Sequence, residues 1–389
     1  MRTPARIAVL LALALTACRG GKDPNFVRAF HEAERAETAG RYAEASARFD
    51  EAAAKAPDPR EKGHAAYLAA KMLERAGDNA GASARLEAIA QQNPPTEHTA
   101  RALYDLADLR IAHGDPDKGY ADLTTLVEKH PSSGLAPHAL IRLASHRDET
   151  SGQKDTIAWL DGLGPRLGKS ELGETIAYQA ALRTQATGDL QGAHARFLAV
   201  VDRWPYPYGN TFDDSLYRAS EIDETLGRNE EAIAHLNRML AERETAHLLG
   251  TYQRPRYIQA ALRIATLYRD RLHDRAKARE AFHRIYADFT TSVYRDDALW
   301  QEAELYRLDG DTNAACSRAS TLVREFPDSR YVPCAEAKCP SVTRPSKSDA
   351  PKKCHDYLSR ARSPEAPHAE PQPPQAPLAG PQLPAAGAN

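Results

Sequence analysis

The sequence predicts an all-α fold, a solenoid of about eight helical hairpins, from three observations. A small residue recurs in most units at a period of 37 residues: Ala45, Ala82, Gly119, Thr156, Ala193, Ala232, Ala278 and Ala315. A glycine stands five residues before most of these, at Gly40, Gly77, Gly114, Gly188, Gly227 and Gly310. A proline stands twelve residues after most of them, at Pro57, Pro94, Pro131, Pro205 and Pro327. A fixed period of this length is typical of repeats that bury their apolar faces only against their neighbours.

Residues 292–328 show how one such unit becomes a hairpin. Apolar side chains at helical spacing run from Leu299 to Tyr306. Gly310 then supplies the left-handed residue that ends a helix. A second apolar stripe follows, and Pro327 stops it. The unit therefore predicts two short helices joined by a tight turn.

This pattern resembles the tetratricopeptide repeat, most clearly in residues 40–57, 188–205 and 310–327. DDALWQEAELYRLDGD (296–311), followed by FPDSRY (326–331), is similar to the variant in bacterial envelope proteins. These include the outer-membrane lipoprotein of β-barrel assembly and the periplasmic coordinator of the Tol–Pal system. The resemblance covers roughly residues 26–330 and implies a right-handed solenoid that binds proteins or peptides. The fourth unit departs from the pattern, with Ser151-Gly152 at its turn and no proline.

The first residues predict a lipoprotein signal peptide at 1–17 and a short tether at 18–25. Arg2 and Arg6 precede an apolar run that is too short to span a bilayer. Leu15-Thr16-Ala17-Cys18 resembles the lipobox of bacterial lipoproteins, which implies cleavage after Ala17 and fatty acylation of Cys18. A plain signal peptide with an incidental cysteine is the alternative. Arg19 replaces the aspartate of inner-membrane retention, so we expect an outer-membrane anchor facing the periplasm, with the inner membrane and the cell surface left open.

Two insertions interrupt the solenoid predicted for 26–330, at residues 204–212 and 244–257. The first contains Trp204, Tyr206, Tyr208 and Phe212 around two prolines. One interpretation is that these are longer turns whose aromatic rings cover helix ends. The alternative is a docking patch for a partner, since insertions in solenoids gather on one face.

The end of the chain predicts a disulfide-linked cap at 331–362 and a disordered tail at 363–389. The candidate disulfide residues are Cys316, Cys334, Cys339 and Cys354. We expect one bridge from Cys316 to the 334–339 segment and one from that segment to Cys354, with the exact pairs open; a zinc site is the less favoured alternative. Residues 348–362 predict a closing helix, capped by Ser348 or Asp349. The tail is rich in proline and almost uncharged.

The first helix of most units also contains a recurring small residue, at Ala33, Ala70, Ala107, Ala144, Ala181, Ser220 and Ala303. The residues three positions before these form a candidate peptide groove. Phe30, Tyr67, Tyr104, Ile141, Tyr178, Tyr217 and Trp300 occupy this position, with Leu262 in the seventh unit. In the resembling family this part of the first helix borders the concave groove. Ordinary packing between repeats is the equally weighted alternative. The lysine–asparagine clamp of chaperone-binding relatives is not reproduced at these positions.

The chemistry of the sequence favours a binding protein over an enzyme. The formal net charge is −2, which does not favour a nucleic acid partner. Motifs of metalloproteases, hydrolases and nucleotide-binding proteins are missing, so we expect no catalytic residue, cofactor, metal or small-molecule substrate. We therefore expect a membrane-anchored periplasmic scaffold that binds envelope proteins in outer-membrane or envelope assembly. The alternatives are a lipoprotein of a motility, pilus or secretion apparatus, and an enzyme or glycan-binding protein with its site in the aromatic insertions.

Overall fold

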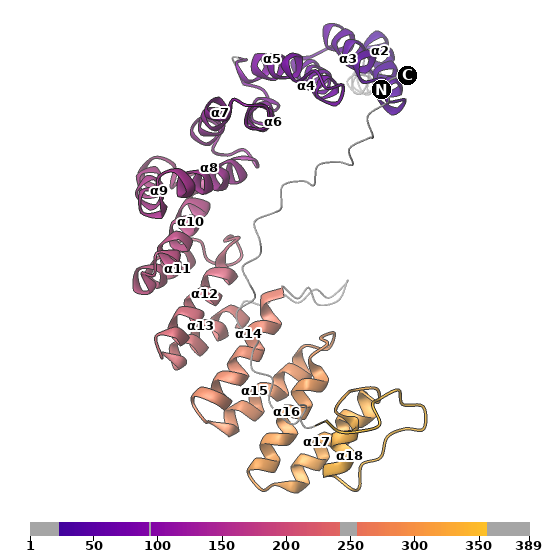
Figure 1. Cartoon of the computed structure of the whole chain (residues 1–389), viewed down its shortest axis with the longest axis vertical. Coiled ribbons are helices and arrows are strands. Elements are labelled where there is room, and N and C mark those ends of the chain that lie inside the picture. The colour runs from indigo at the N-terminus through magenta and orange to yellow at the C-terminus, as the bar shows by residue number, and fades with distance from the viewer. Residues whose placement is uncertain (1–22, 93–94, 242–254, 356–389) are drawn as a thin grey trace, which may run out of the picture. The chain divides into compact units, whose positions relative to one another are not determined.

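The computed structural model describes residues 23–92, 95–241 and 255–355 (Figure 1). Every regular element in these ranges is a helix. The predicted signal peptide, Cys18, the proline-rich tail and most of the second insertion lie outside the described residues. Among the residues that are described, no helix is both long and apolar enough to cross a bilayer.

The chain divides into two compact units, a first part up to Arg196 and a second part from Phe197. The helices of the first part are α2 (Pro24–Thr38), α3 (Tyr42–Ala54), α4 (Pro59–Arg75), α5 (Asn79–Ala90), α6 (Thr99–Ala112), α7 (Pro116–Lys129), α8 (Ala136–Thr150), α9 (Gln153–Leu167) and α10 (Leu172–Ala186). Helix α11 (Leu190–Arg203) begins in the first part and ends in the second. From α2 to α10, each helix packs against the next one in the chain. This is the hairpin array that the period predicts.

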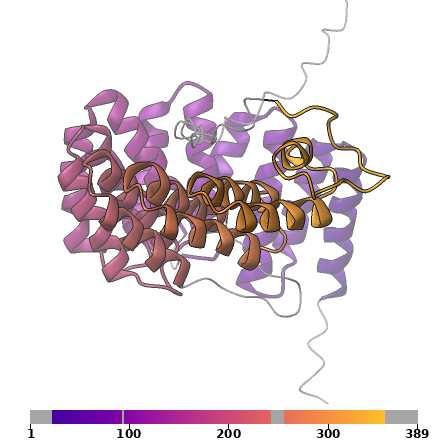
Figure 2. The same cartoon turned by 90° about the horizontal axis from the view of Figure 1, so that it is seen from below.

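The second part repeats the arrangement and ends with a shorter element. Its helices are α12 (Phe212–Thr225), α13 (Asn229–Ala241), α14 (Pro255–Thr266), the π-helix η1 (Leu267–Arg271), α15 (Arg275–Asp288), α16 (Arg295–Leu308), α17 (Thr312–Glu325) and α18 (Val332–Lys338). Helices α16, α17 and α18 lie side by side (Figures 1 and 2). We call the first helix of each hairpin its inner helix. The inner helices are α2, α4, α6, α8, α10, α12, α14 and α16.

The turns inside the hairpins confirm the prediction for the glycines. Gly310 has a φ of 81°, and the other six turn glycines, Gly40, Gly77, Gly114, Gly152, Gly188 and Gly227, also have positive φ. The seventh hairpin lacks a glycine at its turn. There His273 takes the left-handed conformation, with a φ of 53°, after α14 has widened into the π-helix η1.

The recurring small residues are buried where helices approach closely. Ala45, Ala82, Thr156, Ala193, Ala232 and Ala278 are 0% exposed, and Ala315 is 5% exposed. Gly119 shows how tight this position is, because a Cβ atom added there would lie 2.9 Å from the carbonyl oxygen of Ala107. The period in the sequence therefore marks the points of closest helix packing.

A serine turn starts several of the inner helices. The hydroxyls of Ser133, Ser170, Ser292 and Ser329 each accept a hydrogen bond from the backbone N–H two residues later, at 3.2–3.3 Å. Because a serine hydroxyl that bonds to nearby backbone groups competes with the hydrogen bonds of a helix, serine is favoured just before a helix begins rather than inside it. Ser329 begins α18 in the same way, which identifies α18 as a shortened inner helix.

The cap differs from its prediction in one respect. Residues 348–355 are not helical. The Ser348 hydroxyl donates to the carbonyl oxygen of Pro327 at 2.5 Å, and the Asp349 N–H donates to the Asp328 carboxylate at 2.7 Å. These bonds hold the segment next to the end of α17 in an irregular path instead of capping a helix. The rest of the predicted helix, 356–362, lies outside the described residues.

Candidate functional site

The structure places the candidate groove residues of the first part at one register on five successive inner helices. Phe30 lies on α2, Tyr67 on α4, Tyr104 on α6, Ile141 on α8 and Tyr178 on α10. Ile141 is 39% exposed, and the four rings are half-buried. We call these five residues the inner row. Apolar side chains at a regular spacing thus remain partly open to solvent on the inner helices of the first part.

Tyr67 is fixed by the inner helix of the following repeat. Its hydroxyl donates to the Asp105 carboxylate at 2.6 Å, and the Arg101 guanidinium donates to the same hydroxyl at 3.3 Å. Burial of the phenol and the bond to Asp105 raise the pKa of Tyr67 to about 12. The ring is therefore neutral and oriented at physiological pH.

Tyr104 is held in a related way. The Arg142 guanidinium of α8 lies 5.6 Å from the centre of the Tyr104 ring, and Arg142 also pairs with Asp108. A cation at this distance is attracted to the ring face. Tyr67 and Tyr104 are therefore each oriented by a side chain from the following repeat.

An imidazole pair lies among the rings near the start of the first part. His64 of α4 stacks on Phe30 at 5.8 Å between ring centres. His98, which directly precedes α6, lies 5.4 Å from His64 and 5.6 Å from Tyr67. We call Phe30, His64, His98 and Tyr67 the ring stack.

The same register position is covered by other side chains in the second part. The prediction that Tyr217 and Trp300 line a groove is therefore wrong. Tyr217 is 8% exposed, because Arg256 and Arg263 lie over its ring at 4.6 and 5.4 Å. Trp300 is 1% exposed, stacked on Tyr331 at 5.2 Å with the Lys338 ammonium at 4.9 Å. These two residues form the core of the second part rather than a groove; Leu262, on α14, packs against that core.

The aromatic residues of the first insertion also separate into two groups. Phe212 is 2% exposed and Tyr206 packs against the same core, as helix-end packing would require. Tyr208 is 83% exposed.

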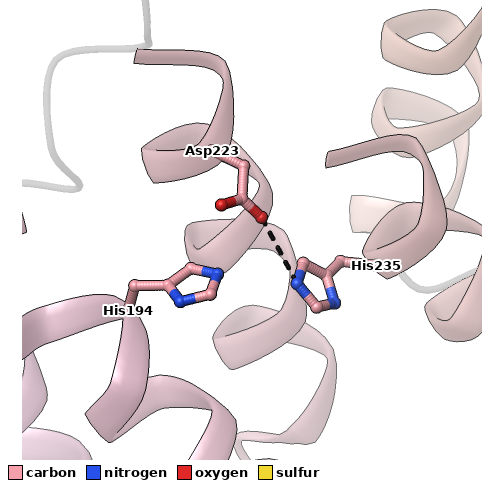
Figure 3. A group of neighbouring side chains, drawn as sticks. All are labelled: His194, Asp223 and His235. Atoms are coloured by element: carbon pink, nitrogen blue, oxygen red, sulfur yellow. Dashed lines mark ion pairs between the residues drawn. The ribbon is translucent and has the colours of Figure 1, made fainter. Parts of the chain in front are cut away.

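A buried carboxylate joins α12 to α13. Asp223 is 0% exposed and pairs with Arg228 at 2.6 Å. It also pairs with His235 at 3.3 Å, as Figure 3 shows. Charged groups this deeply buried need such partners. Nothing in the sequence pattern singled out these residues, because an acid on a helix is usually exposed.

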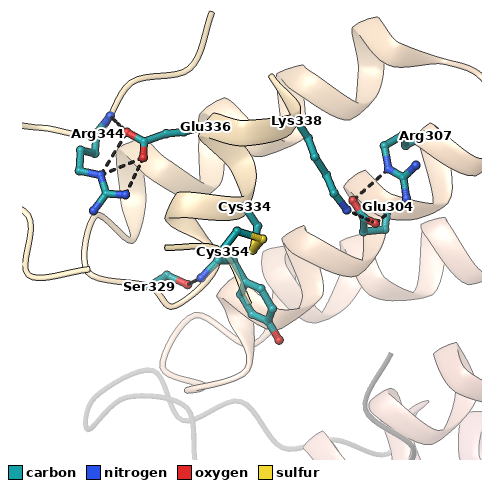
Figure 4. The surroundings of a disulfide bond; sticks show 9 residues. Glu304, Arg307, Ser329, Cys334, Glu336, Lys338, Arg344 and Cys354 are labelled. Atoms are coloured by element: carbon teal, nitrogen blue, oxygen red, sulfur yellow. Dashed lines mark hydrogen bonds and ion pairs between the residues drawn. A yellow bond between two sulfur atoms is a disulfide. The ribbon is translucent and has the colours of Figure 1, made fainter. Parts of the chain in front are cut away.

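The four cysteines of the cap form two disulfides. Cys316 of α17 is joined to Cys339. Cys334 of α18 is joined to Cys354, as Figure 4 shows. All four sulfurs are thus occupied, which leaves no thiolate for zinc. Lys338 pairs with Glu304 of α16 at 2.7 Å, and Arg344 pairs with Glu336 at 2.6 Å, so α18 and the loop after it are also held by charge (Figure 4).

The comparison with models of protein families agrees with this geometry. The family model of the tetratricopeptide repeat matches residues 101–133 and 297–329. A comparison with curated proteins found no significant match.

Several solved structures of repeat proteins are also similar. They include the C-terminal part of a TPR repeat-containing protein from Cytophaga hutchinsonii, at 14% identity and a TM-score of 0.41 over 69% of this chain and 99% of that one. PilF from Pseudomonas aeruginosa matches at 15% identity and a TM-score of 0.36, over 60% of this chain and 95% of that one. PilW, described as a widely conserved type IV pilus biogenesis factor, matches at 13% identity and a TM-score of 0.36, over 61% of this chain and 98% of that one.

The tetratricopeptide repeat typically serves as a non-enzymatic scaffold for binding other proteins. The particular resemblance to the β-barrel-assembly and Tol–Pal proteins stays a prediction. The helical hairpins, their turn glycines and the two matched repeats identify this chain as an all-α protein with a tetratricopeptide-repeat-like fold that contains tetratricopeptide repeats at residues 101–133 and 297–329.

Proposed function

We propose that the protein is a lipid-anchored, non-enzymatic scaffold of the bacterial cell envelope that holds another envelope protein against the inner row. The observation that carries the proposal is the contrast within the chain. One register position is partly exposed on five inner helices of the first part, whereas Tyr217 and Trp300 are covered in the second. A row that is kept partly open is available to a partner.

The expected strength of the inner row follows from its exposed area. Covering the exposed side of one such residue contributes about 1 kcal/mol. Five residues together contribute about 5 kcal/mol, from which the cost of ordering the partner must be subtracted. No single residue of the row can therefore hold a partner tightly. The row therefore suits an extended segment or a helix of the partner that contacts several repeats together.

Two features support an envelope location. Leu15-Thr16-Ala17-Cys18 resembles a lipobox, and the acyl chains of a lipoprotein anchor it firmly to a bilayer. The paired disulfides of the cap suit an exported protein, because disulfides persist in oxidising compartments.

The binding surface is tested by crosslinking in intact cells and identifying the captured proteins. Replacing Tyr104, Ile141 and Tyr178 together with alanine should abolish capture of the main partner while helicity is retained. The matched control is Tyr208→Ala, which removes a ring that is 83% exposed in the second part and should leave capture unchanged. Equal capture by the triple variant and the wild type would reject the inner row as the binding surface.

The anchor is tested separately. Cys18→Ser should move the protein from the membrane fraction to the soluble envelope fraction. An unchanged membrane fraction would contradict lipidation. The identity of the captured partner separates envelope assembly from a motility, pilus or secretion apparatus.

A further inference from the structure

We propose that the ring stack makes the packing of α4 against α6 sensitive to protons, so that mild acid loosens the start of the first part. This inference concerns the fold of the first part and does not depend on the identity of a partner.

The ring stack connects three successive inner helices. Phe30 comes from α2, His64 and Tyr67 from α4, and His98 immediately precedes α6. The His98 ring lies between the two α4 rings, with its centre 5.4 Å from that of His64 and 5.6 Å from that of Tyr67. His98 thus fills the junction between the second and third repeats, and a change in its charge acts directly on that junction.

The backbone of α4 at Gly63 also lies close to the His98 ring. A Cβ atom added at Gly63 would lie 3.2 Å from Cδ2 of the His98 ring. The side chain of His98 is 14% exposed. The ring therefore has little room to turn away from its neighbours when it becomes charged.

The charged groups around His98 offer little compensation for a positive charge. Glu97 is the acid beside it, with its carboxylate 3.4 Å from Nε2, but the Nε of Arg60 already donates a 3.0 Å hydrogen bond to the same oxygen. Tyr67 faces the ring with its hydroxyl bonded to Asp105 and Arg101, so that carboxylate is engaged as well. On α4, both His64 and Arg60 oppose a charge on His98.

The direction of the pH effect follows from these surroundings. Burial lowers the pKa of His98, and the nearby His64 and Arg60 lower it further, while Glu97 opposes them. A histidine whose pKa is lower in the folded state than in the unfolded state favours unfolding once it binds a proton. The junction is therefore most stable at neutral pH, and its stability falls as the pH drops below the ordinary range of histidine, about 6.5.

Hydrogen–deuterium exchange of the full-length protein tests this at pH 7.5 and pH 5.5, with labelling times scaled to the intrinsic exchange rate. The protection of α4 and α6 should fall at the lower pH, relative to α8 and α10, by up to about tenfold, the limit for one histidine of ordinary pKa that stays neutral in the folded state. His64→Phe keeps a ring in the stack but removes one ionisable neighbour, so it should reduce the loss of protection. The matched control is His138→Phe, because His138 occupies the same register position two repeats later on α8 and is exposed; it should leave the loss unchanged.

A second measurement keeps the proposal testable if the His64 variant does not fold. The pKa of His98 in the wild type, obtained from exchange at its ring C2 position, should lie below the ordinary histidine value of about 6.5. A pKa of His98 at or above that value, or protection of α4 and α6 that does not depend on pH, would overturn the proposal.

Discussion

The same substitution at two glycines should change stability in opposite directions. Gly119 lies in α7 and Gly162 in α9, both inside helices of the first part. Alanine is favoured over glycine in a helix by about 1 kcal/mol, because glycine loses more backbone freedom on folding. A Cβ atom at Gly162 meets nothing within 4 Å, so Gly162→Ala should stabilise the protein by about 0.5–1 kcal/mol.

Gly119→Ala adds the same helix preference but also a steric clash. The new Cβ would lie 2.6 Å from Cγ1 of Ile111 and 2.9 Å from the Ala107 carbonyl oxygen. Ile111 can turn aside, whereas the carbonyl belongs to α6 and moves only with its helix. Overpacking of this kind costs about 1–3 kcal/mol, so the net effect should be a loss of about 0–2 kcal/mol.

The assay is urea unfolding of both variants beside the wild type, followed by helical circular dichroism. The two variants should differ by at least about 1 kcal/mol in the free energy of unfolding. If both alanines stabilise the protein equally, the close approach of α6 and α7 at Gly119 is wrong.

Three further predictions concern Tyr67, the cap and Trp300. Tyr67→Phe should cost about 1 kcal/mol through loss of the bond to Asp105. In the folded protein the pKa of Tyr67 is raised to about 12, above its usual value of about 10. The contribution of Tyr67 to stability is therefore full below pH 10 and is lost as the pH rises through 12. Spectroscopic titration of the phenolate in the wild type measures this loss. Replacing Cys334 and Cys354 together with serine should lower the stability of the second part by roughly 2–4 kcal/mol, measured by thermal unfolding, and mass spectrometry of the unreduced wild type should find no free thiol in the cap. Trp300→Ala should cost about 3–5 kcal/mol in chemical unfolding, and a loss below about 1 kcal/mol would contradict its place in the core.

The hairpin array could be predicted from the sequence because its signals are local. A glycine that must adopt a positive φ and a small residue at a close helix contact each reflect one position and its immediate surroundings, as Gly310 and Ala82 show. The turn of the seventh hairpin could not be predicted in this way. There a π-helix precedes the left-handed residue His273, and a π-helix has no regular signal in the sequence.

The candidate site was less predictable, because exposure depends on what the next repeat provides. Tyr67 and Tyr217 occupy the same register, yet Tyr217 is covered by two arginines that come from α14. Periodicity places a side chain on one face of a helix but does not show which distant residue will cover it. The helix predicted to begin at Ser348 was wrong for residues 348–355 for a similar reason, since the Ser348 hydroxyl donates to the carbonyl oxygen of Pro327, 21 residues earlier in the chain.

The two disulfides of the cap affect where the second part can begin to open. In a linear array, the terminal repeat has one neighbour instead of two, and it is ordinarily the first to fray. Here the last inner helix and the loop behind it are crosslinked to α17 and to each other. The weakest position of an ordinary array has thus become a fixed boundary. Local opening in the second part should therefore start at an internal joint, and amide exchange should be slower in α17 than in α13.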